Sequence, residues 1–212
     1  MSAEPSPLDA EGFRESTDVS RETLDRLRTY AELLTRWQSR MNLIGASTLA
    51  DLWHRHMLDS AQLFCRLPDP KMPLADLGSG AGFPGLVLAI MGAADVHLIE
   101  SNARKCAFLR DVIRATGAPV TVHNARIESL AGRQKFSIVT ARACAPLPTL
   151  LGFAETLLAP SGICLFLKGA NANKELTEAK KNWNIDVSRF ASITEKNGCV
   201  LQLGKISRRE LP

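Results

Sequence analysis

The sequence predicts an α/β fold with a mainly parallel sheet and helices on both faces. From Leu74 onward, short apolar runs alternate with stretches of helical periodicity, as in chains built from β-α-β units. The first of these runs ends in a glycine-rich turn that leads into a helix, which is typical of a nucleotide-type site. An amphipathic stretch precedes this part, so we expect an N-terminal helical extension packed on the core.

Length and composition set the outline of the molecule. At 212 residues the chain suits one domain with an elaboration. Residues 1–17 hold prolines and acids without periodicity, which predicts a disordered tail. We assign residues 18–70 to the helical extension and residues 71–212 to the α/β domain, as one globular unit.

Composition narrows the class of protein. A net charge of +4 permits an acidic partner such as RNA without requiring one. No apolar run approaches the roughly 18 residues of a membrane span. The five cysteines are scattered, with no spacing that suits zinc or a disulfide framework. We therefore expect a cytoplasmic protein without a metal or a membrane partner, and a monomer.

The N-terminal part predicts two helices. Apolar residues recur at helical spacing from a Ser20 cap to about Met41. Ser47 or Thr48 can cap a second helix that ends before Pro68. The polar side of the first helix mixes both signs of charge, so a solvated face is favoured over an RNA-binding surface.

Polar residues of the second helix suggest two alternatives. His56 and Asp59 are three positions apart and would meet on one helical face. They would either orient the wall of a binding site or hydrogen-bond within the core, and the second interpretation is favoured. His54 and His56 diverge by about 200° on a helix, which argues against a shared metal.

The glycine turn excludes two common nucleotide motifs. Gly78, Gly80 and Gly82 allow positive φ and a close approach of a ligand to the backbone. A dinucleotide fingerprint needs a third glycine where Phe83 stands, and the lysine of a P-loop is missing. The remaining pattern, Asp-Leu-Gly-Ser-Gly-Ala-Gly at residues 76–82, resembles the first motif of S-adenosylmethionine-dependent methyltransferases.

The rest of the chain continues the alternation. A proline in the first helical turn, glycines at helix ends and Ser or Asn caps set the boundaries. The expected strands cover residues 74–77, 96–99, 120–123, 136–140, 163–167, 189–193 and 199–203, and the expected helices cover residues 84–91, 102–116, 147–158 and 173–183.

Several residues would lie at the carboxyl ends of these strands, where open α/β sheets bind ligands. Glu100 can accept both ribose hydroxyls of an adenosine, since it ends the strand beside the glycine turn. Ile127 can cover the adenine, and Glu128 or nearby backbone can read its edge. The guanidinium of Arg142 can bind a carboxylate or phosphate through two parallel hydrogen bonds. Lys168 adds a cation at the same edge.

Motifs along most of the chain resemble one family. They comprise Trp37, Met41-Asn-Leu43, Arg55-His-Met-Leu-Asp-Ser60, Asp76-Leu-Gly-Ser-Gly-Ala-Gly-Phe-Pro-Gly85, Ala125-Arg-Ile-Glu128, Ala141-Arg-Ala143 and Leu167-Lys-Gly169. In this order they resemble the glucose-inhibited division protein B (RsmG) family, bacterial methyltransferases of small-subunit ribosomal RNA. That resemblance implies a Rossmann-like class I methyltransferase fold with a seven-stranded sheet, S-adenosyl-L-methionine as cofactor, and 16S rRNA or the small subunit as partner.

The resemblance also implies roles for individual residues. Cofactor-binding positions of the family fall on Gly78, Phe83, Ile127, Glu128 and Arg142. To these we add four residues from the turn and the second strand, namely Ser79, Gly80, Gly82 and Glu100. Arg126 and Lys168 fall on positions that the family implicates in the RNA site, and we add His56 to these. Glu100 stands where many members have aspartate, and Ile127 replaces a frequent valine.

The implied reaction, methylation of guanine N7, needs no general base because N7 already exposes a lone pair. Arg142 and Arg126 are then candidates for positioning the substrate through O6 or phosphate rather than N7. A cytosine-C5 enzyme would need a nucleophilic cysteine, for which Cys144 is the candidate. An RNA-binding protein without turnover and a methyltransferase of another base or a small molecule stay open as alternatives.

Overall fold

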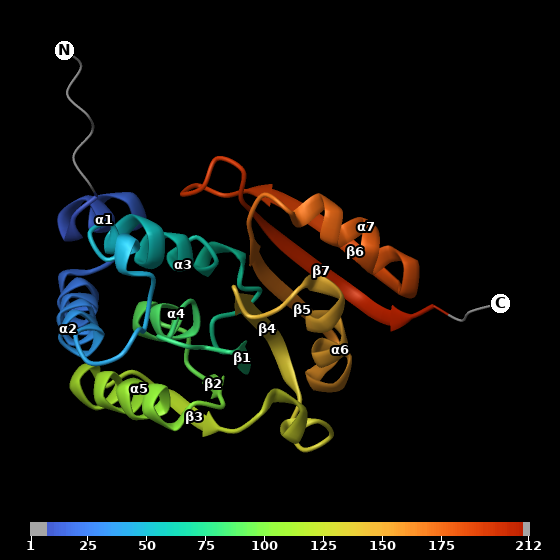
Figure 1. The fold of residues 1–212 in the computed structure, drawn as a ribbon, viewed down its shortest axis with the longest axis horizontal. Coiled ribbons are helices and arrows are strands. Elements are labelled where there is room, and N and C mark those ends of the chain that lie inside the picture. Colours follow the sequence, from blue (N-terminus) through green and yellow to red (C-terminus); the bar gives the residue numbers. More distant parts are fainter. Residues whose placement is uncertain (1–7, 210–212) are drawn as a thin grey trace, which may run out of the picture.

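Seven strands form one sheet in the computed structural model, which describes residues 8–209. Their order is β3-β2-β1-β4-β5-β7-β6 (Figure 1). The strands are β1 (Leu74–Leu77), β2 (Val96–Glu100), β3 (Val120–Asn124), β4 (Phe136–Arg142), β5 (Leu158–Lys168), β6 (Trp183–Ala191) and β7 (Cys199–Arg208). Only β7 runs against its neighbours β5 and β6, so the prediction of a mainly parallel seven-stranded sheet is confirmed.

The strand order reverses at β1, which pairs with β2 on one side and with β4 on the other. Crevices at such a reversal are where open α/β sheets bind ligands. The register sets Leu77 opposite Ile99 and Ala141, so the glycine turn, Glu100 and Arg142 all leave the sheet at one edge.

Helices cover both faces of the sheet (Figure 1). The α-helices are α1 (Ala10–Thr17), α2 (Arg21–Gln38), α3 (Asp59–Ala61), α4 (Gly85–Met91), α5 (Ala103–Thr116), α6 (Leu147–Leu157) and α7 (Ala172–Asn182). Strand side chains alternate between two cores: Leu74 and Ile138 pack with α2, α4 and α5, whereas Ala75 and Val139 pack with α6 and α7. This alternation follows from the two-residue period of a strand.

The helix after β2 shows how local sequence fixes the boundaries. Asn102 caps α5 by accepting hydrogen bonds from the N–H groups of Arg104 and Lys105. Gly117 ends it in a left-handed conformation with φ of 65° and donates to the Ile113 carbonyl. Both boundaries agree with the sequence prediction.

The expected tail through residue 17 is wrong for the segment Ala10–Thr17, which forms α1. Asp9 caps this helix by accepting from the Gly12 N–H, and Phe13 is fully buried with its ring 5.5 Å from that of Trp53. Burial of one aromatic side chain anchors a helix whose polar residues hid its periodicity. Residues 1–7 of the expected tail lie outside the described residues.

The second predicted helix is broken. Residues 46–66 form short 3₁₀ turns at Ala46–Thr48 and Phe64–Arg66, a π-helical turn at Trp53–Leu58, and α3. A π turn widens the backbone and is often found at functional sites. Here the Arg55 carbonyl accepts a hydrogen bond from Arg142, which lies 87 positions away in the chain.

Tyr30 of α2 ties the extension to the glycine turn. Its ring stacks on Phe83 with centroids 5.3 Å apart, and its hydroxyl donates to the Ala81 carbonyl. The extension therefore packs on the core, and its Tyr30 supports the backbone of the glycine turn.

The last strands are longer than predicted. Residues 189–193 were expected to form a strand, but β6 begins at Trp183, directly after α7, and ends at Ala191. Trp183 is buried and pairs with Arg208 of β7, so a long antiparallel ladder extends the strand. No helix within residues 8–209 is long and apolar enough to cross a membrane.

Candidate functional site

A cavity of about 300 Å³ lies beside the glycine turn, and we call it the turn cavity. It opens at the carboxyl ends of β1, β2 and β3. Its lining comprises Gly78, Ile99, Glu100, Ser101, Ala125, Arg126, Ile127, Glu128, Cys144, Ala145, Thr149 and Phe153. Four of the predicted cofactor-binding residues, namely Gly78, Glu100, Ile127 and Glu128, meet here.

Glycine is required at the bottom of this cavity. Gly78 has φ of 61°, and a Cβ built on it would lie 2.6 Å from the Cys144 Sγ. Gly80 and Gly82 also have positive φ, at 57° and 98°. The prediction that these three glycines adopt left-handed conformations is confirmed, and the backbone itself forms the floor beside Cys144.

Glu100 is fixed by two backbone donors. The Gly80 N–H donates to Oε2 at 2.9 Å, and the Asn102 N–H donates to Oε1 at 2.7 Å. Each carboxylate oxygen keeps a second lone pair for an incoming hydroxyl. Glu100 is thus held in position to accept from a vicinal diol, the chemistry expected of a ribose.

The other predicted cofactor residues lie behind or beside the turn. Ser79 is buried and donates to the Asp76 carbonyl, and Gly82 faces Tyr30 and Leu86. Phe83 is buried, and its ring centre lies 4.9 Å from the guanidinium carbon of Arg142. Within residues 8–209, none of these three lines the turn cavity, and neither do the predicted cofactor residues Gly80 and Arg142. Their contribution to cofactor binding stays a prediction.

A second cavity of about 540 Å³ surrounds Arg142, and we call it the arginine cavity. Cys144 and Ala145 line both cavities and form their shared wall. Its polar and charged lining residues include Thr48, Arg55, His56, Asp59, Arg142, Lys168, Glu175, Ser192, Thr194 and Glu195.

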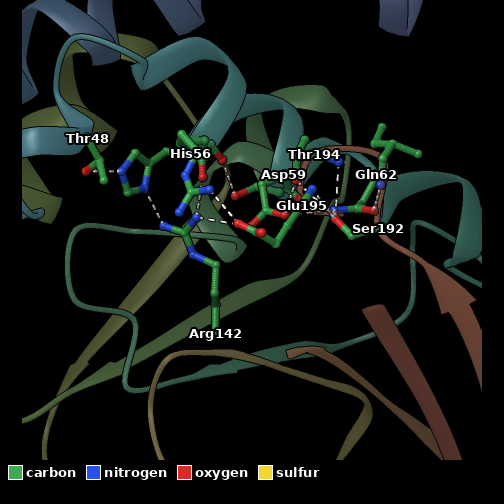
Figure 2. Close-up of polar contacts among 11 residues, drawn as sticks. Thr48, His56, Asp59, Gln62, Arg142, Ser192, Thr194 and Glu195 are labelled. Atoms are coloured by element: carbon green, nitrogen blue, oxygen red, sulfur yellow. Dashed lines mark hydrogen bonds and ion pairs between the residues drawn. The ribbon is translucent and has the colours of Figure 1, made fainter. Parts of the chain in front are cut away.

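Three groups hold the Arg142 guanidinium (Figure 2). Nη1 donates to the Arg55 carbonyl at 3.0 Å and to Asp59 Oδ2 at 3.2 Å. Nη2 donates to His56 Nδ1 at 2.7 Å. The guanidinium carbon lies 4.9 Å from the centre of the Phe83 ring, at the distance of a cation–π contact. Arg142 is therefore fixed in position, with its side chain only 16% exposed.

His56 is held as a neutral ring. Arginine has no acceptor, so His56 Nδ1 must carry the lone pair and Nε2 the proton, which Nε2 donates to Thr48 Oγ1 at 2.8 Å. Burial, together with the nearby Arg142 and Arg55 charges, lowers the pKa of His56 to about 3. The ring also packs on Phe83, with centroids 5.1 Å apart.

The loop between β6 and β7 closes the far side of the arginine cavity (Figure 2). Thr194 Oγ1 donates to Asp59 Oδ1 at 2.7 Å, so Asp59 bridges Arg142 and the loop. Gln62 accepts from the Ile193 N–H at 3.2 Å, and Arg55 forms an ion pair with Glu195. The N-terminal extension and the C-terminal hairpin therefore meet over Arg142.

The ammonium group of Lys168 is paired within the protein. Its Nζ donates to Glu175 Oε2 at 2.7 Å and to the Ala145 carbonyl at 2.9 Å, and its side chain is 9% exposed. The charge is balanced by Glu175, which also accepts from the Leu147 N–H. Arg126, in contrast, is exposed at the mouth of the turn cavity. A role of either residue in RNA binding stays a prediction.

Two ionisable groups near the turn, Cys144 and the buried Asp76, have pKa values above their usual ranges. Burial raises the pKa of Cys144, and the negative charges of Asp76 and Glu100 raise it further. The thiol therefore stays protonated and is a poor nucleophile. Burial raises the pKa of Asp76 to about 6, although Thr140 donates to its Oδ1 at 2.9 Å. The described part of the chain has no group of three or more His, Cys, Asp or Glu residues that could hold a metal ion.

Sequence reasoning missed part of the arginine cavity. The contacts of His56 and Asp59 with Arg142 were not predicted. Both side chains hydrogen-bond in the interior and also line the arginine cavity, so the choice between a binding-site wall and a hydrogen bond within the core stays a prediction. Thr48 was predicted only as a possible helix cap, and Thr194 was not singled out. The spacing of His56 and Asp59 was the available signal, but their partner lies more than 80 positions away.

Comparison with known proteins agrees with this geometry. A chain from Paramagnetospirillum magneticum, named "Ribosomal RNA small subunit methyltransferase G", is 60% identical over 190 residues, covering 90% of this chain and 92% of that protein. One of the same name from Rhodospirillum centenum is 53% identical over 200 residues, covering 94% and 92%.

A solved structure supports the fold. The glycopeptide N-methyltransferase MtfA, crystallised with S-adenosyl-L-methionine, superposes with a TM-score of 0.59 at 12% identity, covering 70% of this chain and 93% of that one. At that identity the likeness shows a shared class I methyltransferase fold.

The family model described as "GidB: rRNA small subunit methyltransferase G" matches residues 23–202. The chain therefore belongs to the GidB family, as the sequence motifs predicted.

Proposed function

We propose that this protein transfers the methyl group of S-adenosyl-L-methionine to N7 of a guanine in 16S ribosomal RNA. One observation carries the proposal: two cavities at the reversal of the sheet share the wall of Cys144 and Ala145. One cavity has the floor of a nucleoside site, and the other surrounds a fixed arginine. The names of the GidB relatives supply the substrate, the small-subunit ribosomal RNA.

The turn cavity fits the cofactor. Glu100 offers lone pairs to ribose hydroxyls, Ile127 gives an apolar cover for adenine, and the glycine floor at Gly78 leaves space that a Cβ would fill. When bound, the cofactor supplies an electrophilic methyl group on a sulfonium. The residues around it bind and orient, and none needs to change its protonation state.

The arginine cavity fits an acceptor that brings its own nucleophile. Guanine N7 has a lone pair in the plane of the base, so no proton must leave before attack. His56 and Asp59 are both engaged in hydrogen bonds, which suits a site without a general base. Positioning of this kind can lower the activation free energy by about 7–11 kcal/mol.

We expect Arg142 and Arg126 to address O6 or phosphate rather than N7. A guanidinium hydrogen-bonded to N7 would occupy the lone pair that must attack. A complex in a reactive pose with either arginine on N7 would contradict this assignment. We propose that the protein is cytoplasmic, because bacterial ribosomal RNA is found there. A monomeric state and the absence of a metal stay predictions.

The test is methyl transfer to ribosomal particles. The protein is incubated with labelled S-adenosyl-L-methionine and small subunits from cells that lack its gene, and the modified base is mapped. One N7-methylated guanine in 16S rRNA is expected. Cofactor binding without methyl transfer would favour an RNA-binding protein, and transfer only to a metabolite would favour a small-molecule enzyme.

A further inference from the structure

We infer that Arg40 and Arg104 form a surface that binds the phosphate backbone of the RNA substrate, next to the exposed Arg126. The inference rests on the proposed function and extends its RNA site onto the helices α2 and α5. It departs from the expectation of a solvated polar side for the first predicted helix, but only at the end of that helix.

Arg40 and Arg104 lie where the ends of two antiparallel helices meet, α2 and α5, which are side by side in Figure 1. Near the start of α2, the Arg26 Nη2 lies 3.5 Å from the position of a Cβ built on Gly117, which ends α5. Past the end of α2, the Arg104 Nη2 donates to the Arg40 carbonyl at 3.3 Å. Since α5 begins just after β2, this second contact lies at the carboxyl edge of the sheet.

The surroundings of this contact carry one sign of charge. Residues 36–47 and 101–105 contain no acid and four cations, which we call the basic edge: Arg36, Arg40, Arg104 and Lys105. The whole chain has 26 Lys and Arg against 22 Asp and Glu, so without these four the two signs are equal. Elsewhere on α2 and α5, in contrast, Arg28 and Arg114 pair with acids. None of the four forms an ion pair within residues 8–209.

Arg126 continues the basic edge around the mouth of the turn cavity. The strand β3 pairs with β2, and Asn124 at its end donates to the Ser101 carbonyl at 3.0 Å. Arg126 follows two residues later and is exposed. The nearby acids are Glu100, which is buried, and Glu128, and both line the turn cavity. Cations from three elements therefore border this cavity.

A phosphate backbone suits such a surface. A nucleic-acid strand carries one negative charge per nucleotide, and each cation that neutralises a phosphate releases counterions. The guanidinium of Arg104 spends one of its five N–H bonds on the Arg40 carbonyl, so most of its donors are left for phosphate oxygens. The backbone beneath is fixed, because the Arg40 N–H donates to the Trp37 carbonyl and the Arg104 N–H to Asn102 Oδ1, both at 2.9 Å.

The experiment compares two double variants of the full chain. The edge variant, Arg40→Gln with Arg104→Gln, removes two cations from the basic edge. The control variant, Arg21→Gln with Arg114→Gln, removes two exposed cations from the opposite end of the same two helices. The Kd for small subunits is measured over a series of KCl concentrations at constant Mg²⁺, together with kcat and KM for methyl transfer. Calorimetry gives the cofactor Kd, and thermal unfolding checks the fold.

The edge variant should bind small subunits more weakly without a change in chemistry. Its KM should rise by about tenfold at low salt, with kcat within about twofold of wild type, since the lost contacts hold substrate and transition state equally. The slope of log Kd against log[KCl] should fall by about 1.5, because each phosphate contact contributes about 0.7–0.9. The control variant should behave as the wild type, and the cofactor Kd should be unchanged in both.

Equal effects of the edge and control variants would show that only net charge matters, and would overturn the inference. A wild-type KM, a loss confined to kcat, or a weaker cofactor Kd in the edge variant would overturn it too. So would a raised KM with an unchanged salt slope, which would indicate a protein of the subunit as the partner. If the wild type methylates no RNA, the proposed function fails, whereas the salt series of Kd values still tests the basic edge by itself.

Discussion

The turn cavity and the arginine cavity lie side by side but are built in different ways. The turn cavity draws Gly78, Glu100 and Ile127 from successive strand ends of one β-α-β-α-β series. The arginine cavity joins Arg142 to residues 83 and 86 positions earlier, and the 192–198 loop to residues more than 130 positions earlier. One is a local product of chain order, whereas the other exists only after the whole chain has folded.

The two cavities also bind by different chemistry. Backbone dominates the turn cavity, where glycine conformations and two N–H groups fix the floor and Glu100. Side chains dominate the arginine cavity, where each charged group has a counter-charge or a neutral partner. Changes of backbone should therefore disturb cofactor binding, and changes of side chain should disturb transfer to RNA.

The largest effect is expected from Gly78→Ala. A left-handed alanine costs about 1–2 kcal/mol, and the clash with Cys144 adds a similar amount. We expect the free turn to relax and relieve this strain, which must then be restored on binding, so cofactor affinity should fall by about 100-fold. Calorimetry with S-adenosyl-L-methionine measures this.

Gly80→Ala is the matched control for Gly78→Ala. It shares the positive φ, but its Cβ would meet only the Gly78 carbonyl oxygen at 3.7 Å. A second substitution, Cys144→Ala, should restore part of the affinity of Gly78→Ala by removing the clash. Equal losses in the two glycine variants would show that Cys144 does not shape the floor.

The pH dependence of stability tests the arginine cavity. The folded-state pKa of His56 is about 3, below its unfolded value near 6.5, so the stability it contributes is complete above pH 6.5 and is lost as pH falls toward 3. At pH 5 the loss relative to pH 7 is about 2 kcal/mol.

His56→Gln should lack this acid-dependent loss. Asp76 shifts in the opposite direction, since its raised pKa favours the folded state as pH falls through 6, but it is present in both proteins and cancels from the difference. Urea unfolding of the wild type and His56→Gln at pH 7 and pH 5 measures this difference in the free energy of unfolding. Parallel pH profiles would show that His56 is not held neutral.

A smaller effect is expected from Tyr30→Phe, which tests the tie between the extension and the turn. The Ala81 carbonyl would lose its buried partner, at a cost of about 1–2 kcal/mol in the free energy of unfolding. Urea unfolding at neutral pH measures the loss. Unchanged stability would mean that the turn does not depend on the extension.

The smallest effect is expected at the rim, between Arg55 and Glu195. Their side chains are 44% and 43% exposed, so a double-mutant cycle with Arg55→Gln and Glu195→Gln should give a coupling of at most about 1 kcal/mol, weaker in salt. A coupling above about 2 kcal/mol would assign the rim pair a leading role in holding the loop.

The sequence allowed prediction of the sheet and of the turn cavity because their signals are local. Glycine spacing, the acid after the second strand and the alternation of elements are all read over short windows. For the arginine cavity the sequence named Arg142, Lys168 and His56 but not the contacts that hold them. Nothing local links Asp59 to Thr194 or His56 to Arg142. The helix Ala10–Thr17 escaped for a related reason, because one buried phenylalanine carries no periodic pattern.

The most direct test of the division between the two cavities uses one protein, Arg142→Lys. Lysine keeps the charge but cannot satisfy Asp59, His56 and a substrate oxygen as a planar fork does. Its cofactor Kd and its methyl transfer to small subunits are measured on the same preparation. We predict turnover lower by about 100-fold at saturating S-adenosyl-L-methionine. Wild-type turnover at saturating cofactor would contradict the account.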